Sequence, residues 1–504
     1  MSISGIINTN INSLSTLNAL NSTSSNLSTY IQQLSTGQQI NGPADNPAGY
    51  AIAQRFTTQI NGLNQAVSNG NQAVSLVQTA TGALQNETNL LQQVRTIAVQ
   101  AANGSNTSAD RASLQGVVSQ LLAQVQTIAT QTQFNGQNIL DGSFSGQQFQ
   151  VGANANQIIN VSISNSQANA IGDYTAGVNT TSGPFSHGLE SVTSDGYGSA
   201  YTLGWATSGG GGVGPYGIYT SGTVQISGSA GSSSVTVTSN DESAAKVASS
   251  INAITQSTGV TATANTSVAF DVTSGSFAFS LSNGTSSTPT NTVNVSANVT
   301  SIDPTGLGGL VSAINNNTAQ TGITASVNTS NQLVLTQSQG RNILLSGFGG
   351  SGALDNSGSP VLSSGSPTSL MVQGFVQLHS TQGFSLSGGS NIGLNDISTL
   401  NAASTVNVST VQGANQAIAI IDSAINALNQ QNGSLGAIQN RVEASVQNLQ
   451  TTATNLQSAR SVVQDANIAE STSQLTKYQI LQQAGISTLA QANALQQSYL
   501  KLLP

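Results

Sequence analysis

INGLNQAVSNGNQAVSLVQTATGALQNETNLL, residues 60–91, repeats apolar residues at alternating steps of three and four. This spacing places them at the a and d positions of one heptad register, as in a helix that packs along another helix. The apolar members are Ile60, Leu63, Val67, Val74, Val77, Leu84 and Leu91. Gly70 interrupts the register at a d position, and Thr81 and Thr88 interrupt it at a positions. The stretch therefore predicts a long helix within a coiled coil.

The helix predicted around this stretch has clear start and stop signals. Asp45 or Asn46 can cap its first turn, and Pro47 suits the first helical position. Gly104 is a breaker just beyond Ala102. A helix between these signals would be roughly 80 Å long at 1.5 Å per residue, more than one compact core can cover. The sequence therefore predicts a rod.

Three further runs keep helical spacing and are predicted to complete the rod. They are Leu114, Val118, Leu121, Val125 and Ile128; then Ala414, Ile418, Ile421, Ile425, Leu428 and Leu435; and Val442, Val446, Leu449, Ala453 and Leu456. Each run is amphipathic, so the helices need one another to cover their apolar faces. The segment 133–163 predicts turns and a β-hairpin that cap the rod.

Both ends of the chain carry apolar stripes that the rod does not use. One stripe is Ile11, Leu14, Leu17, Leu20, Leu27, Ile31 and Leu34, and the other is Tyr478, Leu481, Ile486, Leu489 and Leu495. A lone pair of helices is marginal in water and leaves its outer faces uncovered. Copies of the same chain are the predicted partners. Because the contact pairs different surfaces, it need not close, and an open helical filament is expected.

The middle of the chain, 177–400, is rich in Gly, Ser, Thr, Asn and Val and alternates like β-strands. VASSINAITQSTGVTAT (247–263) matches LVSAINNNTAQTGITAS (310–326), and each copy predicts a short helix followed by a strand. Further strands are predicted at 222–227, 234–239, 277–282, 291–296 and 332–337. The predicted fold class is therefore α+β and multidomain: a helical rod with a β-rich insertion that contains two repeats.

Composition argues against several classes of function. Charged residues make up 5% of the 504 residues, and the formal net charge is −8. No basic stripe could neutralise a run of phosphates, so nucleic acid is not a predicted partner. No run approaches the roughly 20 apolar residues of a membrane span, and the start MSISGIINTNINSLS does not resemble a signal peptide. There is no cysteine for a disulfide or a thiolate metal site.

Short motifs do not predict an enzyme. Gly212, Gly214 and Gly217 match a dinucleotide-binding fingerprint in letters only, because no βαβ unit surrounds them. His187 and His379 are the only histidines and fit no metalloprotease pattern. We therefore predict no catalytic residue, no cofactor and no metal site.

Several segments at both ends resemble bacterial flagellin. In the N-terminal part these are INTNINSL (7–14), LSTGQQINGPADNPAGYAIAQR (34–55), LQQVRTIAVQAANGSNT (91–107), TQFNGQNIL (132–140) and FQVGAN (149–154). In the C-terminal part they are SLGAIQNR (434–441), NLQSAR (455–460) and ILQQAGISTLAQAN (480–493). The resemblance covers about 1–165 and 405–504. The repeat also resembles a small insert domain of some flagellins.

The resemblance implies a filament subunit with five segments. They are an inner-tube helix (1–44), rod helices and a hairpin (45–176), an outer insertion (177–400) with repeats near 222–285 and 286–350, a C-terminal rod helix (401–456) and a second inner-tube helix (457–504). It also implies export through the flagellar secretion apparatus with a chaperone, contact with cap and hook-junction proteins, and an extracellular location on the flagellum. One alternative is a hook-filament junction protein, which shares the end helices. Another is a filament subunit whose outer insertion is adhesive through Trp205 and nearby tyrosines.

The same resemblance predicts two sets of site residues. The assembly set is Ile7, Ile11, Leu14, Leu17, Leu27, Ile31, Leu34, Arg55, Arg95, Ile97, Leu481, Ile486, Leu489 and Leu495. The set for an innate immune receptor is Gln93, Arg95, Ile97 and Val117. Gln93 and Val117 stand where the family typically has a basic and an acidic residue, and Gln39 replaces a usual arginine. Weak receptor activation and the loss of an ion pair between subunits are therefore expected.

Overall fold

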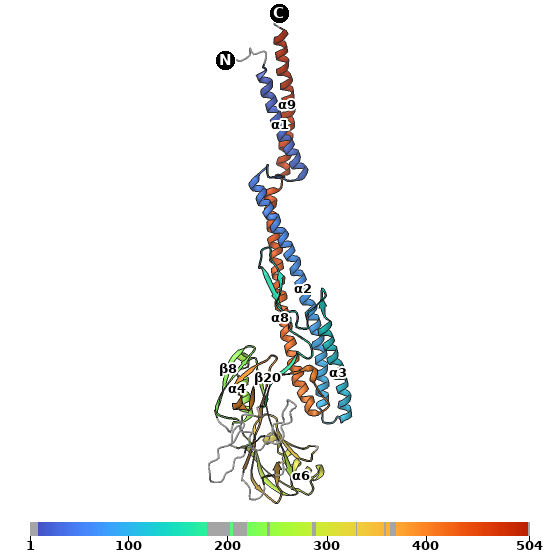
Figure 1. Cartoon of the computed structure of the whole chain (residues 1–504), viewed down its shortest axis with the longest axis vertical. Helices are drawn as coiled ribbons and strands as arrows, with labels where there is room; N and C mark the ends of the chain where they lie inside the picture. The colour runs from blue at the N-terminus through green and yellow to red at the C-terminus, as the bar shows by residue number, and fades with distance from the viewer. Residues whose placement is uncertain are drawn as a thin grey trace. The chain divides into compact units, whose positions relative to one another are not determined.

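The computed structural model describes residues 9–178, 202–204, 219–238, 242–284, 289–328, 330–356, 359–362 and 369–501. The chain divides into two compact units. Unit 1 comprises Met1–Thr79, Ser145–Ser162 and Leu435–Pro504, and unit 2 comprises Ala80–Phe144 and Ile163–Ser434. Long helices come from both ends of the sequence, and strands come from its middle (Figure 1).

Five long helices confirm the helical part of the predicted fold. They are α1 (Ile11–Thr36), α2 (Pro47–Ala102), α3 (Ser108–Gln131), α8 (Val411–Gln464) and α9 (Ile468–Lys501). At the start of α2, the Asn46 side chain accepts a hydrogen bond from the backbone N–H of Gly49, so asparagine is the capping residue. At the start of α3, Thr107 and Asp110 form a reciprocal capping box.

The d positions of the predicted register on α2 are buried, and so are Ile60 and Thr88 at its a positions, but the a positions between them were wrong by one residue. Val67 and Val74 are only half-buried. The residues just before them and their heptad equivalents are buried instead: Ala66, Ala73, Ala80, Glu87, Val94 and Ala101. Helix α8 differs from its prediction in the same way, because Ala417 and Ala424 are buried where Ile418 and Ile425 were expected. Small alanines let neighbouring backbones approach, and the larger β-branched residues flank the seam.

Gly70 marks a close approach within unit 1. A Cβ atom added at Gly70 would lie 2.4 Å from Cγ2 of Val446 on α8. Val442 and Val446 pack beside Ala73 and the strands β3 (Gln147–Gln150) and β4 (Ile158–Val161). The gap in the heptad pattern is therefore a packing requirement, because a larger side chain would collide with a stiff valine.

The helix pairs of unit 1 are interrupted at the same level. Gly37, with φ 71°, ends α1, and residues 465–467 separate α8 from α9. The backbone N–H of Ala466 donates to the carbonyl of Gly37 at 2.9 Å, and that of Gln39 donates to the carbonyl of Gln464 at 2.7 Å. The two breaks therefore satisfy each other's backbone groups.

The strands of unit 2 confirm the β-rich middle of the fold and form three main sheets. The first sheet has the order β11 (Thr290–Val299), β10 (Gly275–Gly284), β14 (Asn342–Gly349), β17 (Ser369–Gln373) and β6 (Thr202–Gly204). The second has the order β12 (Ile323–Val327), β13 (Leu333–Gln337), β9 (Thr261–Val272), β15 (Leu354–Asn356) and β16 (Ser359–Leu362), and β18 (Phe375–His379) also pairs with β9. The third has the order β5 (Gly172–Val178), β20 (Leu394–Ala402), β19 (Ser385–Ser387), β7 (Gly222–Gly228) and β8 (Gly231–Val237). A short hairpin, β1 (Gln133–Phe134) with β2 (Gln137–Asn138), follows α3.

The two sequence repeats have the same local structure. Helices α4 (Ala244–Asn252) and α5 (Thr255–Thr258) precede β9, as α6 (Pro304–Asn315) and α7 (Thr318–Thr321) precede β12. Asn252 makes two side-chain hydrogen bonds to the backbone of Ala262, at 2.9 and 2.7 Å. Asn315 makes the same two bonds to Ala325, at the same distances. Each asparagine therefore ties its helix to the following strand.

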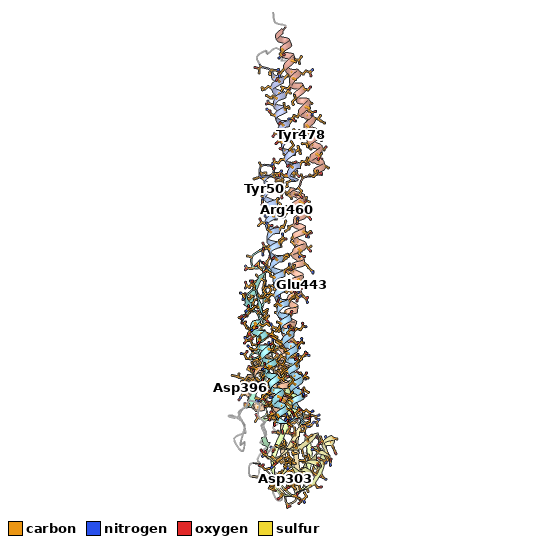
Figure 2. The ribbon with its side chains drawn as sticks, turned by 90° about the vertical axis from the view of Figure 1, so that its right-hand side faces the viewer. Tyr50, Asp303, Asp396, Glu443, Arg460 and Tyr478 are labelled. Atoms are coloured by element: carbon orange, nitrogen blue, oxygen red, sulfur yellow. The ribbon has the colours of Figure 1, made fainter. Side chains whose placement is uncertain are left out.

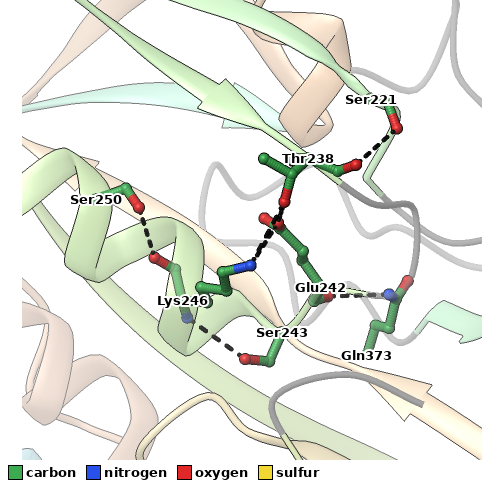
Figure 3. Close-up of polar contacts among 7 residues, drawn as sticks. All are labelled: Ser221, Thr238, Glu242, Ser243, Lys246, Ser250 and Gln373. Atoms are coloured by element: carbon green, nitrogen blue, oxygen red, sulfur yellow. Dashed lines mark hydrogen bonds and ion pairs between the residues drawn. The ribbon is translucent and has the colours of Figure 1, made fainter.

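Each repeat has its own core. Val247 and Ile251 of the first repeat belong to one buried cluster, and Leu310 and Ile314 of the second belong to another. The first turn of α4 is also fixed by polar contacts (Figure 3). Ser243 caps the helix, while the buried carboxylate of Glu242 accepts hydrogen bonds from Lys246 at 2.8 Å and from Thr238. The opposing charge and these donors lower the pKa of Glu242 against the cost of its burial.

Candidate assembly site on the terminal helices

The seam between α1 and α9 is mixed in polarity. Its half-buried side chains on α1 are Ser13, Thr16, Leu20, Thr23, Leu27, Tyr30 and Leu34, and those on α9 are Gln474, Leu475, Tyr478, Gln482, Leu489 and Ala492. The rings of Tyr30 and Tyr478 stack with their centroids 5.5 Å apart, and Figure 2 labels Tyr478 on the upper helix. The Asn10 side-chain amide donates to the carbonyl of Ala492 at 3.1 Å. No residue of α1 is fully buried.

Many apolar residues of the two helices point away from this seam. On α1 they are Ile11, Leu14, Leu17 and Ile31, which are 42–54% exposed. On α9 they are Ile468, Ile480, Leu481, Ile486 and Leu495, which are 44–60% exposed. The predicted stripes therefore split. Leu20, Leu27, Leu34, Tyr478 and Leu489 face the helix pair, while the other predicted members that the structure describes form an outer apolar surface.

This outer apolar surface carries almost no charge. Helix α1 has no charged residue, and α9 has only Glu470, Lys477 and Lys501. Scattered exposed apolar residues are ordinary on protein surfaces, but a repeated series along two paired helices indicates a contact surface. The arrangement can bind another apolar helix surface without the cost of desolvating ions.

The remaining predicted assembly residues lie in different settings. Ile7 lies outside the described residues. Arg55 is exposed on α2, and Ile97 is half-buried on the same helix. Arg95 forms an ion pair with Asp422 of α8, with 2.5 Å between Nε and Oδ1. Both partners are more than 40% exposed, so this pair contributes little to stability.

The predicted receptor residues are accessible to different degrees. Gln93 and Val117 are exposed, and Ile97 is half-buried. The Arg95 guanidinium, although exposed, is already held by the Asp422 carboxylate, and that contact raises its pKa. The segment therefore presents an amide and a valine that is 49% exposed, at the two positions where the family typically has a basic and an acidic residue.

Unit 2 contains a buried carboxyl that the sequence did not reveal as such. Glu87 occupies a seam position of α2 and is fully buried. Its Oε1 accepts a hydrogen bond from the Ser166 hydroxyl at 3.1 Å, while its Oε2 has no hydrogen-bond partner among the residues that the structure describes. Burial raises the pKa of Glu87 to about 8, and the Ser166 bond offsets only part of that effect. The side chain is therefore neutral at pH 7.

The remaining sequence motifs and histidines lie partly within the described residues. Across the described ranges, no helix is long and apolar enough to span a bilayer, and no group of three His, Asp or Glu side chains could hold a metal ion. His379 lies against the buried Asp173, with 2.5 Å between Nδ1 and Oδ2, and its Nε2 is 2.9 Å from the Thr263 hydroxyl. Trp205, His187 and the glycines at 212, 214 and 217 lie outside the described residues.

Family comparisons agree with the helical ends and with a region that contains the second repeat. Residues 7–145 match the bacterial flagellin N-terminal helical region, 418–503 match the C-terminal helical region, and 276–339 match the flagellin hook IN motif. The chain is 37% identical to the B-type flagellin of Pseudomonas aeruginosa, over 99% of both chains. The chain belongs to the bacterial flagellins. It is also 32% identical to a flagellin of Salmonella choleraesuis, again over 99% of both chains.

A solved structure, FliC from Burkholderia pseudomallei, matches with 21% identity and a TM-score of 0.30, covering 73% of this chain and 99% of that one. The full-length similarity to flagellins confirms the predicted function: this flagellin is a subunit of the bacterial flagellar filament, a structural protein whose copies assemble. It follows that its place is the flagellum outside the cell.

Sequence reasoning missed three features. The stacking of Tyr30 on Tyr478 was not predicted, although a tyrosine at heptad spacing on each helix was a signal for it. The requirement for glycine at position 70 was visible only as a gap in the register. The burial of Glu87 had one signal, its place among apolar residues of α2 as the only acid between positions 46 and 109.

Proposed function

We propose that the outer apolar surface of α1 and α9 is where copies of this flagellin contact one another in the filament. The observation that supports this proposal is that many side chains in the α1–α9 seam are polar, while Ile11, Leu14, Ile486 and Leu495 face outward. Covering nine such side chains contributes about 1 kcal/mol or more each, since full burial of a large apolar side chain contributes roughly 1.5–3 kcal/mol. A helix pair that is marginal alone becomes stable in a filament.

In this proposal the five predicted segments have separate roles. Segments 1–44 and 457–504 build the inner tube, 45–176 and 401–456 form the rod, and 177–400 is displayed outward. Gln39, and the sequence DNPAG (45–49) where the family usually has DDAAG, are expected to leave one intersubunit ion pair unmade. The protein is exported by the flagellar secretion apparatus with a chaperone and meets cap and hook-junction proteins, as its family membership suggests. Its role is structural rather than enzymatic.

The test is elongation of short filament seeds by purified monomer, followed by electron microscopy. The variants are a chain lacking residues 480–504, Ile486→Gln, and Ile397→Gln as a matched control. Ile397 is 72% exposed but lies on β20, in the insertion. We expect the intact chain and Ile397→Gln to elongate the seeds and the other two to fail. Elongation by the truncated chain would refute the proposal, whereas failure of the intact chain would favour the hook-filament junction alternative.

We also propose that this flagellin activates the innate flagellin receptor weakly. The supporting observations are the uncharged, exposed Gln93 and Val117 and the engagement of Arg95 by Asp422. A receptor reporter assay should give a response well below that of a typical enteric flagellin. Introducing a basic residue at 93 and an acidic one at 117 should raise it, and an equal response from the unmodified chain would contradict the idea.

A further inference from the structure

Unit 2 contains a cavity of about 680 Å³ with three walls. One wall is the segment that runs from Ser164 to Tyr174 at the start of β5. The second is the loop Thr381–Gly383 after β18, and the third is the part of α8 from Ala427 to Ser434. Protein pockets that bind small ligands typically measure about 300–1,000 Å³. The cavity is therefore large enough for a ligand of one or two rings.

Polar contacts beneath the cavity hold its three walls in place. The buried carboxylate of Asp173 accepts hydrogen bonds from His379 at 2.5 Å and from the Ser423 hydroxyl of α8 at 3.1 Å. Tyr174 and Ser380 exchange backbone hydrogen bonds at 2.9 and 3.1 Å. The strand, the loop and the helix are thereby joined just outside the lining. A site with fixed walls loses less entropy when it binds a ligand.

The lining excludes two ligand classes. None of its side chains is charged, so an ionic ligand would lose its hydration without gaining a counter-charge. Asn165, Gln382, Gln430 and Gln431 bring amide groups to the cavity. A wholly apolar ligand would displace water from these amides without replacing the hydrogen bonds. The lining therefore fits a neutral ligand with many hydroxyl or amide groups.

Apolar groups in the same lining narrow the choice further. Ile171 and Leu428 offer apolar contacts beside the amides, and Tyr174 contributes its ring. A Cβ added at Gly383 would begin 3.7 Å from Cε1 of Tyr174, so glycine leaves part of this half-buried ring open to the cavity. A pyranose ring presents both C–H groups and hydroxyls, and an acetamido group adds a methyl and an amide. We propose that this cavity binds a neutral saccharide that contains an N-acetylhexosamine unit.

The experiment uses the full chain as monomer and three probes: N,N′-diacetylchitobiose, maltose and N-acetylneuraminic acid. Binding is followed by saturation-transfer NMR and by calorimetric titration. We expect saturation of the diacetylchitobiose signals, with the acetamido methyl among the strongest. Maltose should bind more weakly, and N-acetylneuraminic acid, which is anionic, should not bind.

Two variants and a control connect binding to the cavity. Gly383→Leu fills the space beside Tyr174 and should abolish binding. Gln430→Ala removes one exposed amide and should weaken binding roughly threefold to tenfold, the effect of one neutral hydrogen bond. Gln447→Ala, on an exposed part of α8 outside the lining, should leave binding unchanged. Absence of binding to diacetylchitobiose, equal binding of N-acetylneuraminic acid, or unchanged binding by both variants would overturn the proposal.

Discussion

The neutral, buried Glu87 predicts that the free energy of unfolding of this flagellin falls as pH rises. Below its ordinary pKa of 4.5, the carboxyl is protonated in both the folded and the unfolded chain, so its contribution to the free energy of unfolding is fully present. Between pH 4.5 and about 8, the unfolded chain releases the proton and the folded chain keeps it. The folded state then binds more protons than the unfolded state, so the free energy of unfolding declines as pH rises. The contribution of Glu87 is lost above the pKa that it has in the folded chain.

The size of the effect follows from the pKa change. At about 1.4 kcal/mol for each tenfold change in proton affinity, a shift from 4.5 to about 8 corresponds to on the order of 5 kcal/mol. This is a large fraction of the roughly 5–15 kcal/mol that stabilises a typical domain. Glu87→Gln keeps the shape and the acceptor for Ser166 but cannot ionise. It should therefore unfold with nearly the same free energy as the parent at pH 5 and be several kcal/mol more stable at pH 9.

Urea denaturation of the monomer, followed by far-UV circular dichroism at pH 5, 7 and 9, measures this difference. Glu470→Gln is the control, because Glu470 is exposed on α9 and its replacement should leave the pH dependence in place. A constant difference between Glu87→Gln and the parent at all three pH values would refute the reasoning. It would mean that the carboxyl meets water or an unrecognised partner in the folded chain.

Three further predictions concern packing and the repeats. Gly70→Ala should destabilise the chain by about 1 kcal/mol, because a collision with Val446 costing roughly 1–3 kcal/mol outweighs a helix-propensity gain of about 1 kcal/mol. Adding Val446→Ala should remove that collision in a double-mutant cycle. Additive effects of the two substitutions would contradict the prediction. Asn252→Ala and Asn315→Ala should each lower the free energy of unfolding by about 2 kcal/mol, since each variant loses two matching hydrogen bonds. Thermal unfolding measures both losses, and strongly unequal losses would argue against equivalent repeats. Arg95→Ala should leave the free energy of unfolding almost unchanged because its ion pair with Asp422 is exposed, and a clear loss of stability would show that the pair is more important than its exposure implies.

Much of the helical architecture could be predicted from local signals. The bounds Pro47 and Ala102 of α2 agree with the predicted ones, because a cap, a proline and a glycine act within a few residues of where they stand. The d positions of the heptad were also correct. The family resemblance identified the class of protein, since its motifs lie in order at both ends.

The tertiary structure decided which side chains the helices bury. Alanine fits either a surface or a tight seam, so hydrophobicity alone favoured Val67 over Ala66 and Ile418 over Ala417. Only the distance between neighbouring backbones selects the smaller residue. The apolar stripes at the ends split for a related reason: a helix has a full circumference, and one partner covers only part of it.

The charge state of Glu87 and the cavity framed by Asp173 and His379 also depend on long-range contacts. The sequence by itself determined where the long helices and the strands around the two repeats run, because those signals are local. The fold alone determined which polar groups lost water and which partners replaced it, because residues 79 and 206 positions apart had to meet first.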